Sequence, residues 1–151
     1  MKPTVREALY RYCETYIQDR YARIERQIQS LQQALISETK SSAGDKHETG
    51  RAMIQLEREK LGNQLAEVEL LQQRFKKVPL EGASDQVVLG SLVFTSQYHY
   101  YIGISAGKVT VEDQTFFAIA PNTPMGKLLM GKSQGECINF NGSEFCITAI
   151  G

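Results

Sequence analysis

Two carboxylates stand three residues apart in a short polar stretch of the chain, Asp45 and Glu48 within residues 39–50. Carboxylate oxygens can bind a hard cation such as Mg²⁺, and they can also accept hydrogen bonds from the free N–H groups at the start of a helix. From the spacing alone the second role is favoured, with Asp45 as the N-cap and Glu48 completing a capping box. Lys46 and Arg51 beside them can contact phosphates or acidic groups, or remain solvated.

Long helical patterns lie on both sides of this stretch. Residues 4–39 contain neither Gly nor Pro and predict a helix that begins with a capping box of Thr4 and Glu7. Its apolar seam is spaced four and three apart: Ile17, Tyr21, Ile24, Ile28, Leu31 and Leu35. Residues 51–78 predict a second helix, which Pro79 ends. Its apolar seam is Ile54, Leu61, Leu65, Val68, Leu71, Phe75 and Val78.

The two helices are similar in length and are joined by a short break, which predicts an antiparallel coiled-coil hairpin over residues 1–78 with its tip at residues 40–50. At about 1.5 Å per residue, the rod would be about 45–50 Å long. Before its regular seam, the first helix carries another apolar stripe: Val5, Leu9, Tyr12, Cys13 and Tyr16. This aromatic-rich stripe predicts contact with something larger than a single helix.

The second half of the chain has a different hydrophobic period. Residues 79–86 are a linker by composition, and the runs that follow are rich in β-forming residues and separated by turns. Strands are expected at 87–94, 98–104, 108–111, 115–119, 136–140 and 144–150. Asn141-Gly142 is a strong hairpin signal, and Thr123-Pro124 can start a short helix at 125–130. Residues 87–151 therefore predict a small, mostly antiparallel β domain with one helix, and the whole chain an α+β protein.

Composition limits the class of protein. The 151 residues carry a formal net charge of +0, which argues against a protein that coats nucleic acid by bulk charge. No signal-peptide core follows the first residues and no apolar run is long enough to cross a membrane, so a cytoplasmic protein without membrane contact is expected. The three cysteines, Cys13, Cys137 and Cys146, lack CxxC spacing, which favours reduced, packed thiols over a zinc site.

A long helical hairpin followed by a small β domain, with Gly44, Asp45 and Glu48 at the tip, resembles the Gre transcript-cleavage factors of bacterial RNA polymerase. The resemblance covers nearly the whole chain. Its second support is the segment Thr123-Pro124-Met125-Gly126-Lys127-Leu128-Leu129-Met130-Gly131-Lys132, followed by Gly135-Glu136. This segment is similar to the family's Ser-Pro-x-Gly…Leu-x-Gly-Lys…Gly-Asp/Glu pattern, which belongs to a domain with an FKBP-like fold.

The resemblance implies a specific function. The β domain, through the loop with Thr123 and Pro124, would dock on bacterial RNA polymerase, and the hairpin would reach through the secondary channel to the active site. There Asp45 and Glu48 would help to hold a Mg²⁺ ion shared with the polymerase, which then cleaves the 3′ end of backtracked RNA. The chain would not be an enzyme itself and would have no small-molecule substrate. Its partners would be the polymerase and the RNA 3′ end.

Other functions remain open. After Glu48 the family's tip continues Asn-Ala-Glu-Tyr, whereas this chain continues with Thr49-Gly50-Arg51-Ala52. The difference favours a regulator or inhibitor that enters the secondary channel without stimulating cleavage. An FKBP-type prolyl isomerase and a structural coiled-coil adaptor are further alternatives. The basic residues of the rod either attract RNA, as in the family, or form the polar side of the coiled coil. They are Arg20, Arg23, Arg26, Arg58, Lys76 and Lys77.

Overall fold

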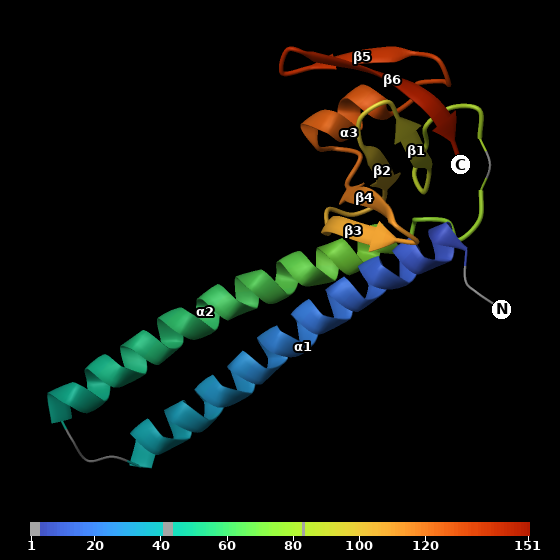
Figure 1. Ribbon diagram of the computed structural model, residues 1–151. Helices are drawn as coiled ribbons and strands as arrows, with labels where there is room; N and C mark the ends of the chain where they lie inside the picture. Colours follow the sequence, from blue (N-terminus) through green and yellow to red (C-terminus); the bar gives the residue numbers. More distant parts are fainter. Residues whose placement is uncertain (1–3, 41–43, 83) are drawn as a thin grey trace. The chain divides into compact units, whose positions relative to one another are not determined.

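The computed structural model describes residues 4–40, 44–82 and 84–151, with the side chains of residues 39, 40 and 44–47 outside this description. Two long helices are followed by four strands, a short helix and two more strands (Figure 1). This element order confirms the α+β class, with an N-terminal helical hairpin before a β region. Within the described ranges, neither long helix has the continuous apolar stretch that a bilayer crossing needs.

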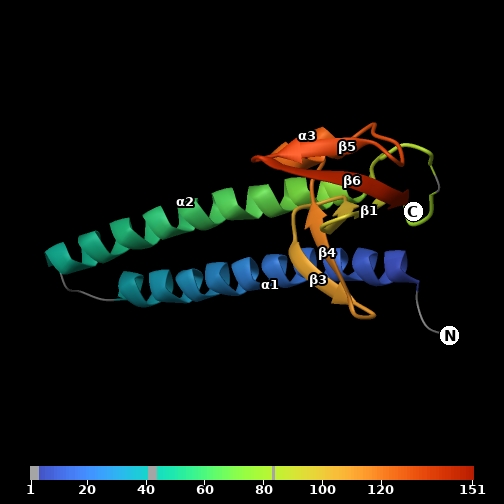
Figure 2. The ribbon, with the colours of Figure 1, turned by 45° about the horizontal axis from the view of Figure 1, so that its top comes forward.

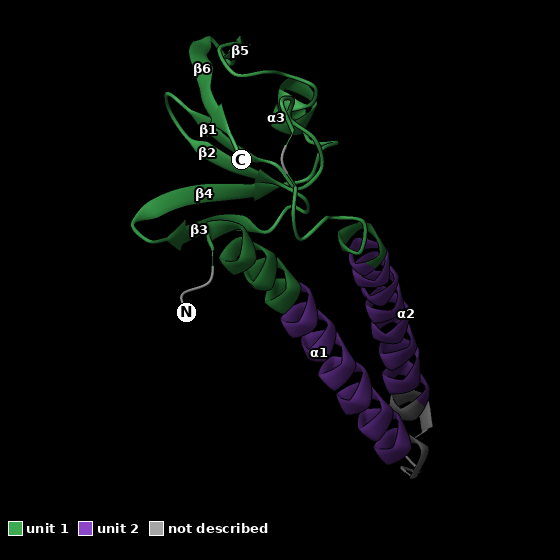
Figure 3. Cartoon of the chain, turned by 90° about the vertical axis from the view of Figure 1, so that its right-hand side faces the viewer, with its two compact units in different colours: residues 1–16, 73–151 green, residues 17–72 purple. Residues whose placement is uncertain are grey.

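Contacts divide the chain into two compact units, residues 17–72 and residues 1–16 with 73–151 (Figure 3). The unit of residues 17–72 contains the larger parts of α1 (Val5–Lys40) and α2 (Gly44–Phe75), which run side by side (Figures 1 and 2). The seam between them is buried at Ile17, Ile24, Leu61 and Val68. It is only half-buried at Ile28, Leu31, Leu35 and Ile54. The predicted seam therefore forms, and it is packed less completely toward the tip.

The start of α2 differs from the prediction. The sequence predicts a tip between the helices at residues 40–50, but α1 reaches Lys40 and α2 begins at Gly44, so the prediction is wrong for residues 40 and 44–50. Acidic side chains are favourable in the first turns of a helix because the free N–H groups there carry partial positive charge. Asp45 and Glu48 supply two such side chains. The remainder of the predicted tip, 41–43, lies outside the described residues.

The first turns of α1 belong to the unit that contains the sheet. The predicted capping box begins the helix, because Glu7 N donates to Thr4 Oγ1 at 3.1 Å and Thr4 N donates to Glu7 Oε2 at 3.3 Å. One turn further on, Cys13 is fully buried and Tyr12 Oη donates to the Ala106 carbonyl at 3.4 Å. The apolar stripe on these turns therefore contacts the β region, as its breadth predicts.

A six-stranded sheet forms the rest of this unit, in the order β3-β4-β2-β1-β6-β5. The strands are β1 (Leu92–Thr95), β2 (His99–Ile102), β3 (Gly107–Val111), β4 (Gln114–Ile119), β5 (Cys137–Phe140) and β6 (Ser143–Ile150). Strand β3 lies at the edge of the sheet, and β4 lies between β3 and β2. Strand β4 pairs antiparallel with β3 and parallel with β2. The β2–β4 pair is therefore parallel within a sheet that the sequence predicts to be mostly antiparallel. The other neighbouring pairs are antiparallel, as predicted. Helix α3 (Pro124–Leu129) buries Leu129 in the core of this unit.

The cysteines correct a prediction. Cys137 and Cys146 lie directly opposite each other in β5 and β6 and form a disulfide, so these two are not the reduced thiols that the sequence predicts. Cys13 is a free, buried thiol, as expected. The hairpin that brings the pair together turns at Asn141 and Gly142, both with positive φ (52° and 84°). Such a turn fixes the strand register, and the register places the two sulfur atoms within bonding distance.

Candidate functional site

The predicted metal ligands lie in the first turns of α2. Glu48 is exposed, and Asp45 lies three residues earlier inside the same helix rather than at its N-cap. Positions three residues apart share a helix face, so the backbone places the two residues on one side of α2. The side chains of Asp45 and Lys46 are outside the described residues. Arg51, three residues after Glu48, is half-buried on the same side of the helix.

A third carboxylate lies close to this helix. The side chain of Glu38, in the last turns of α1, approaches the backbone of Gly50, where a Cβ would lie 2.5 Å from Glu38 Oε1. Glycine at position 50 therefore leaves room for an acidic side chain. Sequence reasoning missed Glu38. A signal in the sequence was Gly50 itself, because a residue without a Cβ permits a close approach to the backbone.

Mg²⁺ is the ion that the resemblance implies for the tip. Within the described part of the chain, no group of three or more His, Cys, Asp or Glu side chains is placed to hold a metal ion. Glu48 offers an exposed carboxylate, which is the ligand type that Mg²⁺ takes together with water. The Glu48 carboxylate therefore fits Mg²⁺ as a single ligand. Other residues, water or a partner would have to supply the remaining ligands.

The predicted docking residues begin α3. Thr123 is the N-cap, and its hydroxyl accepts from Gly126 N at 3.1 Å and donates to the Ala120 carbonyl at 2.7 Å. Pro124 occupies the first turn of the helix and is exposed, as is Lys127. Both hydrogen-bonding functions of the Thr123 hydroxyl are therefore used inside the loop. Pro124 and Lys127 are the side chains that remain available to a partner.

Structural requirements account for other residues of this segment. A Cβ on Gly126 would lie 2.9 Å from the Pro121 Cα, against backbone that cannot yield easily. Gly131 and Gly135 have φ of 80° and 91°, a region that side-chain-bearing residues rarely adopt. Glu136 accepts a hydrogen bond from Ser133 N through its carboxylate. The segment is thus built to hold the loop and α3 in one conformation.

Comparison with solved structures finds a structural likeness to a transcription factor. The chain is 23% identical to a solved structure of the transcription factor Gfh1, with a TM-score of 0.35, over 87% of this chain and 92% of that chain. At this identity and TM-score, the likeness carries no argument about activity. No protein-family model matches the chain. No curated protein matches it either.

Proposed function

We propose that the chain is a Gre-type transcription factor that binds bacterial RNA polymerase through its secondary channel and stimulates cleavage of backtracked RNA. The observation that carries the proposal is the exposed carboxylate of Glu48, three residues after Asp45, at the end of a helical hairpin. The 32 residues of α2 extend about 48 Å at about 1.5 Å per residue. A two-helix rod of this length can carry the two carboxylates into a narrow channel.

Carboxylate chemistry supports the proposed role of the tip. Asp45 and Glu48 would supply hard oxygen ligands for a Mg²⁺ ion that the polymerase also holds. When bound, Mg²⁺ lowers the pKa of a coordinated water and stabilises charge on a leaving oxygen. The chain's own part would be to place these oxygens, while Lys46 and Arg51 would contact RNA phosphate. The chain would then assist the nuclease activity of the polymerase and would not be an enzyme by itself.

Docking is the second part of the proposal. The β region, FKBP-like in this proposal, would bind the polymerase through the start of α3, where Pro124 and Lys127 are exposed. Thr123 would shape this surface, since its hydroxyl is already used within the loop. Replacing Lys127 with Glu should weaken polymerase binding and leave the cleavage rate unchanged at saturating protein. A lower cleavage rate at saturation would contradict this division of roles.

The test uses halted, backtracked elongation complexes with labelled RNA. The wild-type chain should speed the release of short 3′ fragments, and Glu48→Gln and Asp45→Asn should each slow that release about tenfold or more. Glu59→Gln is the matched control, because Glu59 is an exposed carboxylate of α2 outside the tip. Competition against a known channel factor should detect equal binding by all four proteins. Full activity of both tip variants would refute the assignment.

A channel regulator without cleavage activity is the second candidate. Position 50 favours it, because the family's tip has alanine there, and in this chain a Cβ at Gly50 would meet the carboxylate of Glu38. This chain therefore departs from the family's sequence pattern at a position where the tip is closely packed. The same assay separates the two candidates. A regulator would compete for the channel and change elongation or initiation without releasing short RNA.

A further inference from the structure

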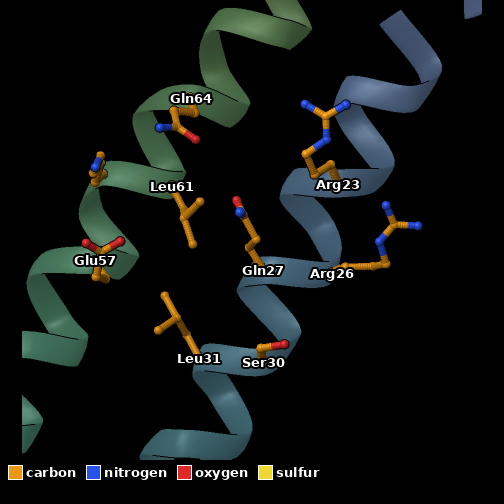
Figure 4. Close-up of a pocket in the computed structure, with 9 residues that line it drawn as sticks. Arg23, Arg26, Gln27, Ser30, Leu31, Glu57, Leu61 and Gln64 are labelled. Atoms are coloured by element: carbon orange, nitrogen blue, oxygen red, sulfur yellow. The ribbon is translucent and has the colours of Figure 1, made fainter. Parts of the chain in front are cut away.

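A polar groove lies on one side of the hairpin, within the unit of residues 17–72 (Figure 4). Its volume is about 480 Å³, within the range of about 300–1,000 Å³ that is usual for small-molecule sites. Its α1 side is Arg23, Arg26, Gln27, Ser30 and Leu31. Its α2 side is Glu57, Lys60, Leu61 and Gln64. The lining includes neither of the tip carboxylates and no residue of α3.

The groove exists because the apolar seam has a gap. The seam of α2 has apolar residues at Ile54 and Leu61, but the residue that faces the groove between them is the polar Glu57. Leu31, which lies on the facing side of α1, is therefore only half-buried. Leu31 and Leu61 point into the space between the helices and form an apolar floor (Figure 4).

The charges that line the groove favour an anion. Arg23, Arg26 and Lys60 supply three cations, against the single carboxylate of Glu57. Among the side chains that the structure describes, these three cations make no ion pair. By contrast, Arg20 on the next turn of α1 is paired with Glu67 at 3.7 Å. Unpaired guanidinium and ammonium groups around a concave surface are the usual means of binding phosphate.

We propose that this groove binds a small phosphate-bearing molecule of nucleotide size. Arg23 and Lys60 would hold the phosphates from opposite helices, with Arg26 at the rim, where its side chain extends outward from α1 (Figure 4). The apolar floor accommodates a planar base, and the amides of the groove offer further donors. Glu57 would accept hydrogen bonds from ribose hydroxyls, a role that a bare polyphosphate would leave unfilled.

Isothermal titration calorimetry with the full chain tests the proposal without any polymerase. The ligands are ATP, sodium tripolyphosphate, adenosine and a short RNA oligonucleotide, in buffer with EDTA so that tip-bound metal makes no contribution. ATP should bind most tightly, tripolyphosphate more weakly and adenosine most weakly. Arg23→Gln and Lys60→Gln should each weaken ATP binding about tenfold.

Arg58→Gln is the matched control, because it removes the same charge from an exposed position on α2 outside the groove lining. ATP affinity should be unchanged in this variant, and circular dichroism should give equal helix content for all four proteins. No ATP binding at millimolar concentration would overturn the proposal. Equal losses in Arg58→Gln and Arg23→Gln, or binding of RNA without ATP, would overturn it too, since either result indicates a diffuse basic surface.

Discussion

Glu38 of α1 lies against the backbone of Gly50 of α2, so closely that a Cβ on Gly50 would be 2.5 Å from Glu38 Oε1 and 2.8 Å from its Cδ. The contact joins the last turns of one helix to the first turns of the next. Glycine at position 50 leaves the space that the Glu38 carboxylate occupies. The contact also sets how alanine at position 50 should compare with alanine at position 62, where a Cβ would meet nothing.

Alanine at position 62 should stabilise the hairpin more than alanine at position 50. Gly62 faces open space, so Gly62→Ala should gain the full helix propensity of about 1 kcal/mol. Gly50→Ala gains the same propensity, but the Glu38 side chain must move away, so its net gain should be smaller. Urea unfolding of both variants measures the difference. An equal or larger gain for Gly50→Ala would mean that Glu38 does not contact this backbone.

The loop before α3 should depend on its N-cap. Thr123→Ala removes both hydrogen bonds of the hydroxyl and should lower the free energy of unfolding by about 1 kcal/mol. Gly126→Ala should cost more, about 1–3 kcal/mol, because its Cβ meets the backbone of Pro121. Lys127→Ala, at an exposed position of the same helix, is the control and should change stability little. Thermal unfolding of the three variants measures these losses of stability. An unchanged stability of Gly126→Ala would contradict the close contact between Gly126 and the backbone of Pro121.

Reductant should destabilise the β5–β6 hairpin. The Cys137–Cys146 disulfide closes a short loop, with a sequence separation of 9, and its loss should cost about 2–3 kcal/mol. Thermal unfolding with and without a phosphine reductant measures this, and the double variant Cys137→Ser/Cys146→Ser should be insensitive to reductant. Alkylation of the unreduced, denatured chain should modify one of its three cysteines. Modification of all three would contradict the bond.

Local patterns predict much of this fold, because they are properties of neighbouring residues. The spacing of Ile17, Ile24, Leu61 and Val68 is enough for the hairpin, and Asn141-Gly142 is enough for the last turn. Thr123 begins α3 as predicted. Pairings between distant residues were not accessible in this way. The parallel β2–β4 pair and the Glu38–Gly50 contact depend on how separate elements meet in three dimensions. The disulfide, by contrast, follows from the Asn141-Gly142 turn, whose register places Cys137 opposite Cys146. The groove left a signal, the polar residue at position 57 of the seam.

Tyr101→Phe should leave stability unchanged or raise it by about 1 kcal/mol. Tyr101 is fully buried, and its hydroxyl has no hydrogen-bond partner among the described residues. A buried hydroxyl without a partner has lost its water contacts without compensation, so removing it recovers that cost. Urea unfolding at neutral pH measures the change. A loss of more than about 1 kcal/mol would mean that the hydroxyl has a partner in solution, such as a buried water.

Stability should fall at alkaline pH, and Cys13 should account for part of the fall. Burial raises the pKa of the Cys13 thiol to about 12 from an ordinary value of 9.0. The folded state therefore keeps its proton where the unfolded state loses it, so the stabilisation is complete below pH 9.0 and is lost as the pH rises toward 12. Near pH 10 the loss should be about 1 kcal/mol.

Burial also raises the pKa of Tyr101, which acts in the same direction. Comparing wild type with Cys13→Ala between pH 8 and pH 10 measures the contribution of the thiol together with its effect on the pKa of Tyr101, and the variant should have the smaller dependence on pH. Equal slopes would mean that the thiol reaches solvent in the folded state.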